Sequence, residues 1–237
     1  MRNQFVRHAL IVVFCLGTAV ACSAQGNSGG GIKIQRIRQN VFMLVGDGAN
    51  ITLQVEPPAA DESYDSTYGG DKGVLIVDTG TTAMSSQLLA TIRRLSSGPI
   101  RYLINTSADA DHVGGNEALA KASAGIVRGA LAGRQPDAPL MILSHETVLE
   151  RMGAPTGKQP AYSTDAWPTD VYTNQKEAFF NGGSIQILHQ SGAHSDGDSI
   201  VFLRRSDVIS AGEIFSTPDF RLSMRPREDI FKGSSMA

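Results

Sequence analysis

The chain has 237 residues, of which 41% are hydrophobic and 19% charged, a mixture typical of a globular protein with one large domain or two small ones. Its formal net charge is −2, so neither a polyanion nor an anionic membrane surface is an expected partner. We also expect no nucleic-acid partner, because the net charge is slightly negative and the sequence shows no stripe of basic and aromatic residues.

Residues 1–24 have the layout of a secretory signal peptide. Arg2 and Arg7 flank a short polar start, and an apolar stretch ending in small residues follows. An uncleaved anchor is a second interpretation, although the stretch is short for a bilayer, and lipid attachment at Cys22 is a third. Residues 25–32 are rich in glycine and predict a flexible leader. We therefore expect an exported protein, periplasmic or secreted, that contacts a membrane only through this segment.

Both cysteines, Cys15 and Cys22, lie in or at the edge of the signal segment. The mature domain therefore has no disulfide and no thiolate ligand for a metal. Any metal site must be built from histidine and carboxylate side chains.

Strands and helices alternate in the first half of the domain. The runs at 32–46 and 49–56 are rich in β-branched residues and predict strands, and the polar stretch at 57–73 predicts a loop. A continuous apolar run then ends in Asp78, which is typical of a buried strand with a polar end. The later segments are expected as a helix at 85–97 capped by Ser85 or Ser86, a strand at 98–106 and a helix from 114. This order indicates an α/β layer fold.

The second half is richer in strands. We expect an insertion at 125–139, then a short strand and helix, and then a loop at 154–170 that holds the only tryptophan. Short strands are expected at 176–180, 183–190, 198–205 and 207–212. Together these elements predict one domain over residues 33–215. Residues 216–237 show no strand or helix period and are expected to form an irregular tail.

Three segments place metal-competent side chains at a strand end followed by a turn, namely 109–112, 192–198 and 211–213. In an open α/β layer, strand ends on one side converge on a crevice, so these segments can meet near Asp78. We interpret His145 and His189 as hydrogen-bonded structural residues. Asp196 and Asp198 are expected to brace a turn through bonds to backbone N–H groups. Gly114 and Gly115 are expected to permit a tight strand-to-helix connection.

The motifs resemble the metallo-β-lactamase superfamily. They read VDTG, INTSADADHVGGNEAL, ILSHETVLERM, GAHSDGDSIVFL and VISAGEIF, in that family's order, and span most of the chain from about Asn40 to Phe215. The resemblance implies an αββα sandwich with a metal site at one edge of two facing sheets. The family's last histidine has no counterpart here, because no histidine follows His194. We therefore expect the C-terminal part of the sandwich to be incomplete.

The family's ligand motif, H-x-H-x-D-H, is altered. Ser107 and Asp109 stand where the family has its first two histidines, while Asp111 and His112 are kept. The separate histidine is kept as His194, and Glu213 replaces the bridging aspartate.

The resemblance implies zinc, bound by Asp109, Asp111, His112, His194 and Glu213, with Asp78 and Ser107 behind these ligands. Oxygen-rich ligand sets favour Mn²⁺, Fe²⁺ or Mg²⁺ over Zn²⁺, so we expect one weakly bound ion or none rather than two.

A bound metal would lower the pKa of a water toward about 7 and direct it at an ester, thioester or amide carbonyl of a small molecule. Asp111 or Asp109 would then handle the proton. Two alternatives remain open: a non-catalytic relative that binds a ligand in the crevice, and a truncated, inactive product. The sequence identifies neither the substrate nor the oligomeric state.

Overall fold

The computed structural model describes residues 31–57, 72–127, 140–154 and 161–215. The predicted signal peptide at 1–24, most of the leader at 25–32, the tail at 216–237 and most of the loop at 57–73 lie outside these ranges, as does most of the predicted insertion. Within the described ranges, no helix has the length and apolar character needed to cross a membrane.

Among the described residues, the larger sheet has seven strands in the order of the sequence. Its first four strands pair antiparallel, and the later strands pair parallel from β4 to β7. The strands are β1 (Lys33–Arg38), β2 (Val41–Gly46), β3 (Ala49–Gln54), β4 (Val74–Val77), β5 (Ile100–Ile104), β6 (Met141–His145) and β7 (Asp170–Tyr172). Strand β7 begins at Asp170, the last residue of the predicted loop, and its other two residues lie where no element was predicted, because a run of three residues is too short to show a period.

Strand β4 is buried on both faces, as its continuous apolar run predicts. Alternate side chains point to opposite sides of a strand, and here each side has its own core. Val74 and Ile76 belong to the cluster that packs against the helices. Leu75 and Val77 belong to the cluster between the two sheets.

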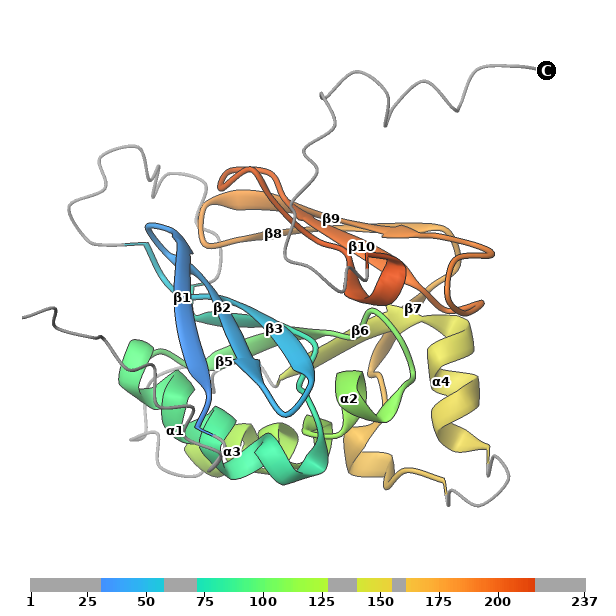
Figure 1. Ribbon diagram of the computed structural model, residues 1–237, viewed down its shortest axis with the longest axis horizontal. Helices are drawn as coiled ribbons and strands as arrows, with labels where there is room; N and C mark the ends of the chain where they lie inside the picture. Colours follow the sequence, from blue (N-terminus) through green and yellow to red (C-terminus); the bar gives the residue numbers. More distant parts are fainter. Residues whose placement is uncertain (1–30, 58–71, 128–139, 155–160, 216–237) are drawn as a thin grey trace, which may run out of the picture.

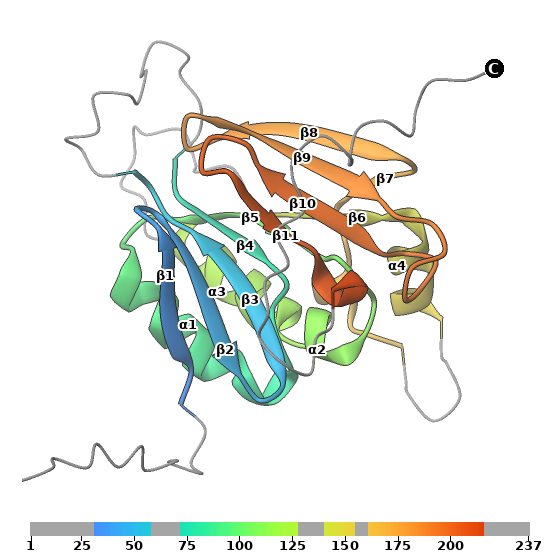
Figure 2. The same cartoon turned by 45° about the horizontal axis from the view of Figure 1, so that its top comes forward.

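The smaller sheet is a four-stranded antiparallel sheet in the order β11-β10-β9-β8. Its strands are β8 (Gln175–Phe180), β9 (Gly183–His189), β10 (Ser199–Leu203) and β11 (Val208–Ser210). Ile185, Ile187, Val201 and Leu203 point toward the larger sheet and are buried. Figures 1 and 2 show the smaller sheet stacked over the larger one.

Helices α1 (Ser85–Leu95) and α3 (Asn116–Val127) cover the other face of the larger sheet (Figure 1). Leu88 and Ile92 of α1 and Leu119 of α3 are fully buried against it. The other helices in the described part of the chain are α2 (Ala110–Val113), α4 (Glu146–Gly153) and three 3-10 turns: η2 (Thr82–Met84), η3 (Thr164–Ala166) and η4 (Gly212–Ile214). The predicted serine cap of α1 is wrong by one position, since Met84 is the capping residue.

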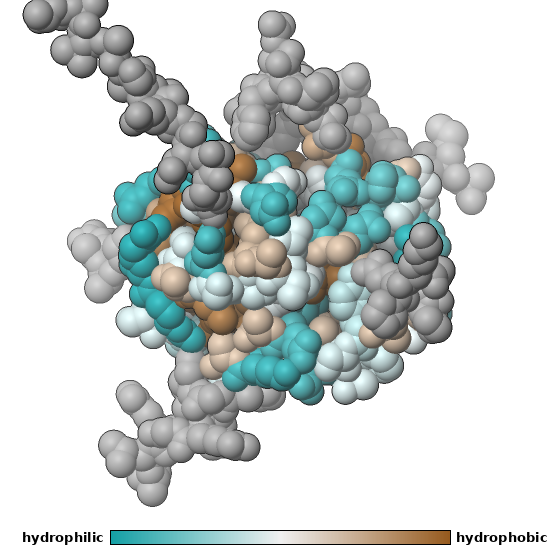
Figure 3. All heavy atoms as spheres, turned by 60° about the horizontal axis from the view of Figure 1, so that its bottom comes forward, coloured by the Kyte–Doolittle hydropathy of each residue, from teal (hydrophilic) through white to brown (hydrophobic). Residues whose placement is uncertain are grey.

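On the helical side of the molecule, hydrophobic residues are interspersed with hydrophilic ones (Figure 3). Among the residues that the structure describes, no α-helix lies on the outer face of the smaller sheet (Figures 1 and 2). The described layers are therefore helices, the large sheet and the small sheet, in the order α, β, β of the predicted αββα sandwich.

This topology brings distant segments to one edge of the sandwich. Asp78 follows β4, and the segment from Asn105 to Asp109 follows the neighbouring parallel strand β5. The loop that carries His194 precedes β10, and Glu213 follows β11. A backbone hydrogen bond, in which Ser199 N donates to Thr106 O at 3.0 Å, joins the two sheets at this edge.

Phe180 tests the core between the sheets. Its ring is fully buried and meets Tyr102 edge-on, with ring centroids 4.9 Å apart. We expect Phe180→Ala to lower the free energy of unfolding by about 3–5 kcal/mol, because it leaves a cavity between the sheets. Phe179→Ala is the matched control, since that ring is 47% exposed, and it should cost about 1 kcal/mol or less. Urea unfolding measures both, and equal losses would contradict the described orientation of β8.

Candidate metal centre

Asp78 fixes the imidazole of His112. The Asp78 backbone is left-handed, with φ 63°, a conformation that aspartate tolerates better than most residues. Its buried carboxylate accepts hydrogen bonds from Thr106 N at 2.8 Å and Thr106 Oγ1 at 2.6 Å. His112 Nδ1 lies 2.9 Å from Asp78 Oδ2. Because a carboxylate only accepts, Nδ1 carries the hydrogen, and Nε2 is the nitrogen directed at the other acids.

The short helix α2 is locked in place by a buried network. Thr79 Oγ1 donates to Asn116 Oδ1 at 2.9 Å, and Asn105 Nδ2 donates to the same oxygen at 3.2 Å. Thr79 N also donates to the carbonyl of His112 at 2.8 Å. A Cβ on Gly115 would lie 2.7 Å from Thr79 O, so this glycine permits the close approach that the sequence predicts. The network fixes the backbone that carries His112.

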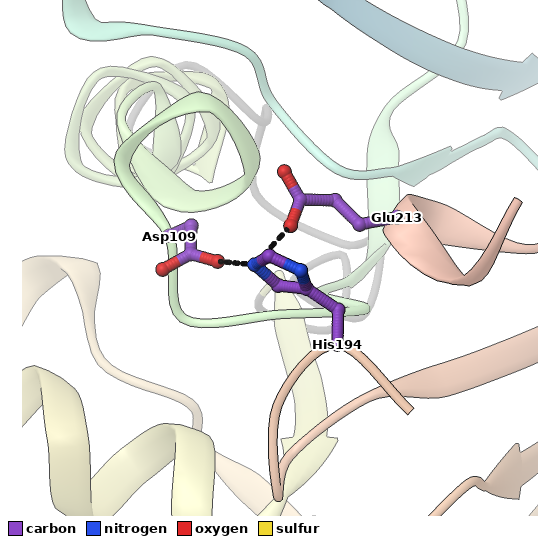
Figure 4. Close-up of side chains that lie close together, drawn as sticks. All are labelled: Asp109, His194 and Glu213. Carbon is purple, nitrogen blue, oxygen red and sulfur yellow. Dashed lines mark ion pairs between the residues drawn. The ribbon is translucent and has the colours of Figure 1, made fainter. Parts of the chain in front are cut away.

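Two groups of three side chains have their ligand atoms within 4.8 Å of one another. The first group is Asp109, His194 and Glu213, and the second is Asp111, His112 and Glu213. Figure 4 shows the first, with the ring of His194 between the two carboxylates. We call them the His194 trio and the His112 trio. The structure thus brings together all five residues predicted as metal ligands.

Glu213 belongs to both trios, and each of its oxygens faces one imidazole. Oε1 lies 3.5 Å from His112 Nε2, and Oε2 lies 2.8 Å from His194 Nε2. Oε2 is buried, yet within the described residues it has no partner with hydrogen-bond geometry. A buried carboxylate oxygen in this state is costly unless a positive charge faces it. This oxygen fits the ligand atom of a cation site.

Gly212 allows Glu213 to reach both imidazoles. Its φ is +53°, and a Cβ at this position would lie 2.4 Å from Thr106 Oγ1. Only glycine tolerates both the left-handed backbone and the close contact. The turn η4 therefore lies directly against the residue that holds Asp78.

Ser107 and Asp109 form a local pair. Ser107 Oγ is fully buried and donates to Asp109 Oδ2 at 3.0 Å, while His194 Nε2 lies 3.6 Å from the same oxygen. Ser107 belongs to neither trio. Its hydroxyl therefore orients the carboxylate of Asp109.

The charges around His112 raise its pKa. Burial of the ring lowers the pKa, but the charge and hydrogen bond of Asp78 and the charges of Asp111 and Glu213 outweigh this and raise it to about 10. The imidazole is therefore protonated at neutral pH when no metal is bound. A cation that binds Nε2 must displace this proton.

The turn after His194 is braced by one of its two aspartates. Asp198 accepts from Ser195 N at 2.7 Å and Ser195 Oγ at 2.6 Å, as predicted. The carboxylate of Asp196 instead pairs with Arg151 at 2.7 Å, so its predicted role in the turn is wrong. The sequence spacing alone does not distinguish the two, because Arg151 comes from a distant helix.

Thr106, Asn105 and Asn116 are missing from the residues predicted from the sequence. Each lies within or next to the INTSADADHVGGN motif, so the segment is identified, but the role of its neutral side chains is not. Asn105 and Thr106 directly follow a buried strand, and Asn116 begins helix α3. All three are buried, where every polar group needs a partner, and this is the signal that could have identified them.

The profile described as metallo-beta-lactamase superfamily matches residues 65–228, more than half of the chain. The chain belongs to the metallo-beta-lactamase superfamily. No curated protein sequence matches it. The fold class and the family resemblance predicted from the motifs are therefore confirmed.

Solved metallo-beta-lactamases share the fold at low sequence identity. A Cronobacter sakazakii protein with a HARLDQ motif (mutant S60) is 18% identical, with TM-score 0.53 over 74% of this chain and 60% of its own. BJP-1, a subclass B3 enzyme of Bradyrhizobium japonicum, is 12% identical, with TM-score 0.53 over 73% of this chain and 57% of its own. LRA-12, a class B3 di-zinc metallo-beta-lactamase from an Alaskan soil metagenome, is 15% identical, with TM-score 0.54 over 73% of this chain and 57% of its own. The chain thus spans no more than 60% of the length of these three structures.

Asp78→Asn tests the support of His112 in this metallo-beta-lactamase relative. The amide of asparagine has no charge and only one acceptor oxygen, so it cannot accept the hydrogen bonds of both Thr106 and His112 as the carboxylate does. The His112 ring then loses its fixed orientation. We expect the affinity for a divalent cation to fall by about 10–100-fold. Asp47→Asn is the control, because Asp47 is also left-handed, with φ 46°, but exposed. Competition with a chromophoric chelator measures both, and equal affinities in the two variants would contradict the assigned role.

Gly212→Ala tests the placement of Glu213. We expect it to weaken cation binding at both trios, because the added methyl group collides with Thr106 and displaces the turn. Gly192→Ala is the control: its φ is +74°, but a Cβ there meets nothing within 4 Å. The control should show only the backbone strain of about 1–2 kcal/mol in unfolding. Unchanged cation binding in the first variant would contradict the described turn.

Proposed function

We propose that the protein is an exported metal-dependent hydrolase that acts on an ester, thioester or amide-type bond of a small molecule. One observation carries the proposal: the two oxygens of Glu213 face two imidazoles, each accompanied by a further aspartate. Membership of the metallo-beta-lactamase superfamily supports a metal-dependent activity. The signal-like N-terminus supports export.

The residues fit a divalent cation. Each trio offers one imidazole nitrogen and two carboxylates, and the buried Glu213 Oε2 lacks a hydrogen bond within the described residues. Three protein ligands leave a coordination position for water or substrate, as in catalytic sites. In place of the one ion or none expected from the sequence, we propose up to two ions, because each trio supplies three ligand atoms and Glu213 contributes to both. This oxygen-rich set of ligands suits Mn²⁺ or Fe²⁺ as well as the Zn²⁺ that the family resemblance implies. Mg²⁺, a hard cation that prefers oxygen ligands, is a further alternative.

A bound divalent cation would supply Lewis acidity, which polarises a carbonyl and makes a water acidic near neutral pH. The chain's own residues supply the rest. Asp78 holds the His112 ring so that Nε2 faces the centre, and Ser107 holds Asp109. The side chain of Asp111 is 38% exposed, so its carboxylate can take a proton from the attacking water and release it to solvent. Asp109 is the second candidate for this step.

Ser107 favours one alternative, a non-catalytic relative that binds a ligand in the crevice. It stands where the family has a histidine, is fully buried, and belongs to neither trio. The trios therefore contain one imidazole each. Such a relative would bind a cation without turnover, so metal binding and hydrolysis have to be measured separately.

Glu213→Gln is the decisive variant. Gln keeps the size of the side chain but removes the charge that faces both imidazoles. We expect the purified wild type to bind Mn²⁺ or Zn²⁺. The variant should lose more metal affinity than the roughly 10–100-fold that is typical when a hydrogen-bond partner of a metal ligand is removed. Glu177→Gln, an exposed glutamate on β8, is the control and should bind as the wild type does.

Equilibrium dialysis gives the binding, and a panel of chromogenic ester, thioester and β-lactam substrates gives the activity. Hydrolysis that is removed by a chelator, restored by metal and lost in the Glu213 variant supports the hydrolase. A wild type that binds metal without hydrolysing any substrate supports the binding relative. A wild type that binds no metal contradicts both.

A further inference from the structure

Two stacked imidazoles lie beside the loop that carries His194. The rings of His145 and His189 are parallel within 13°, with centroids 3.7 Å apart. His145 is buried at the junction of β6 and α4, and His189 ends β9. The proposed chemistry uses neither residue. Their predicted role as hydrogen-bonded structural histidines agrees with these contacts, but the contacts also reach the site.

Each ring donates to a backbone carbonyl. His145 Nε2 lies 2.8 Å from Thr173 O, and His189 Nε2 lies 2.9 Å from Asp196 O. A carbonyl oxygen only accepts, so both Nε2 atoms carry the hydrogen. His145 Nδ1 in turn accepts from Thr147 N at 3.3 Å and caps helix α4. The stacked pair thus connects α4 to the loop at Asp196.

The hydroxyl of Thr147 in α4 also reaches this carbonyl. Thr147 Oγ1 lies 3.2 Å from Asp196 O and 2.9 Å from His145 Nδ1, so its single hydrogen is shared between these two acceptors. The next residue, Gly197, packs so closely that a Cβ would lie 2.8 Å from Thr147 Oγ1 and 2.9 Å from Val148 Cγ2. Asp196 O is therefore the point at which the loop is anchored to the helix.

His194 depends on this anchor because its own ring is little packed. Its side chain is 57% exposed, and its imidazole faces the carboxylates of Asp109 and Glu213. The anchored carbonyl lies two residues further along the chain. We propose that His189 is a positioning residue for His194: by donating to Asp196 O from a ring stacked on buried His145, it places the imidazole for the His194 trio. This inference rests on the proposed metal centre.

The ion pair between Arg151 and Asp196 is a weaker explanation for the same placement. The two side chains are 41% and 64% exposed, and exposed pairs contribute about 0–1 kcal/mol. Because the pair acts on the same residue, Arg151→Ala is a matched control for the hydrogen bond to the carbonyl.

Two substitutions of His189 separate the donor from the ring. His189→Phe keeps an aromatic ring for stacking and removes the donor. His189→Gln keeps an N–H donor near the position of Nε2 and removes the ring. If the donor positions the loop, the Phe variant should lose metal affinity at the His194 trio and the Gln variant should recover most of it.

The His194 trio is measured alone in a His112→Asn background. Asn retains a donor for Asp78 and lacks Nε2. In this background we expect His189→Phe to weaken Mn²⁺ binding by about 10–100-fold, in the range of outer-sphere partners. In a His194→Ala background, which leaves only the His112 trio, the same change should have no effect. Arg151→Ala should have no effect in either.

A second readout needs no metal. In the metal-free protein, amide exchange at Gly197 and the ring ¹⁵N shifts of His194 report the loop and its contact with Glu213. We expect both to change in His189→Phe and to return toward wild type in His189→Gln. Unchanged exchange and shifts in the Phe variant, or equal weakening of both trios, would overturn the positioning role. Failure of the wild type to bind metal would contradict the proposed function alone, since exchange and shifts would still decide this role.

Discussion

The cluster of four carboxylates at one edge of the sandwich is the constraint on which the rest of the site depends. The carboxylates of Asp78, Asp109, Asp111 and Glu213 each lie within 4 Å of a nitrogen of His112 or His194. The four negative charges are therefore gathered around two imidazoles, and like charges in one site repel each other. In the metal-free protein, the proton on His112 compensates part of this charge, and the surrounding acids hold its pKa near 10. Glu213 Oε2 remains buried without a hydrogen bond in the described part of the chain. A divalent cation would neutralise more of this negative charge than the single proton on His112 does.

The fold holds these charges together by packing rather than by local sequence. The period-two alternation in β4 divides its side chains between two cores, and this fixes the register that places Asp78 beside the end of β5. The smaller sheet is held against the larger one by the core that contains Phe180 and Ile187. Its position brings the His194 loop and η4 to the same edge.

The sequence was sufficient to predict the fold and the segments of the site, because both follow from local patterns. Apolar runs that end in polar residues identify strands whose ends converge, and the order of the motifs identifies the family. Strand β7 was missed because three residues show no period. The sharing of Glu213 by two imidazoles was also beyond prediction, since it depends on the left-handed Gly212 and on its contact with Thr106. The stacking of His145 on His189 likewise joins segments that are distant in the chain.

The candidate ligands are richer in oxygen than the H-x-H-x-D-H pattern that the family resemblance implies, and we propose that this difference changes which cation binds. The most direct measurement is electron paramagnetic resonance of the protein titrated with Mn²⁺. If Glu213 joins two sites, the spectrum at two equivalents will be that of a spin-coupled pair and will be absent in the Glu213→Gln variant. A spectrum of isolated or free Mn²⁺ throughout the titration would contradict the account.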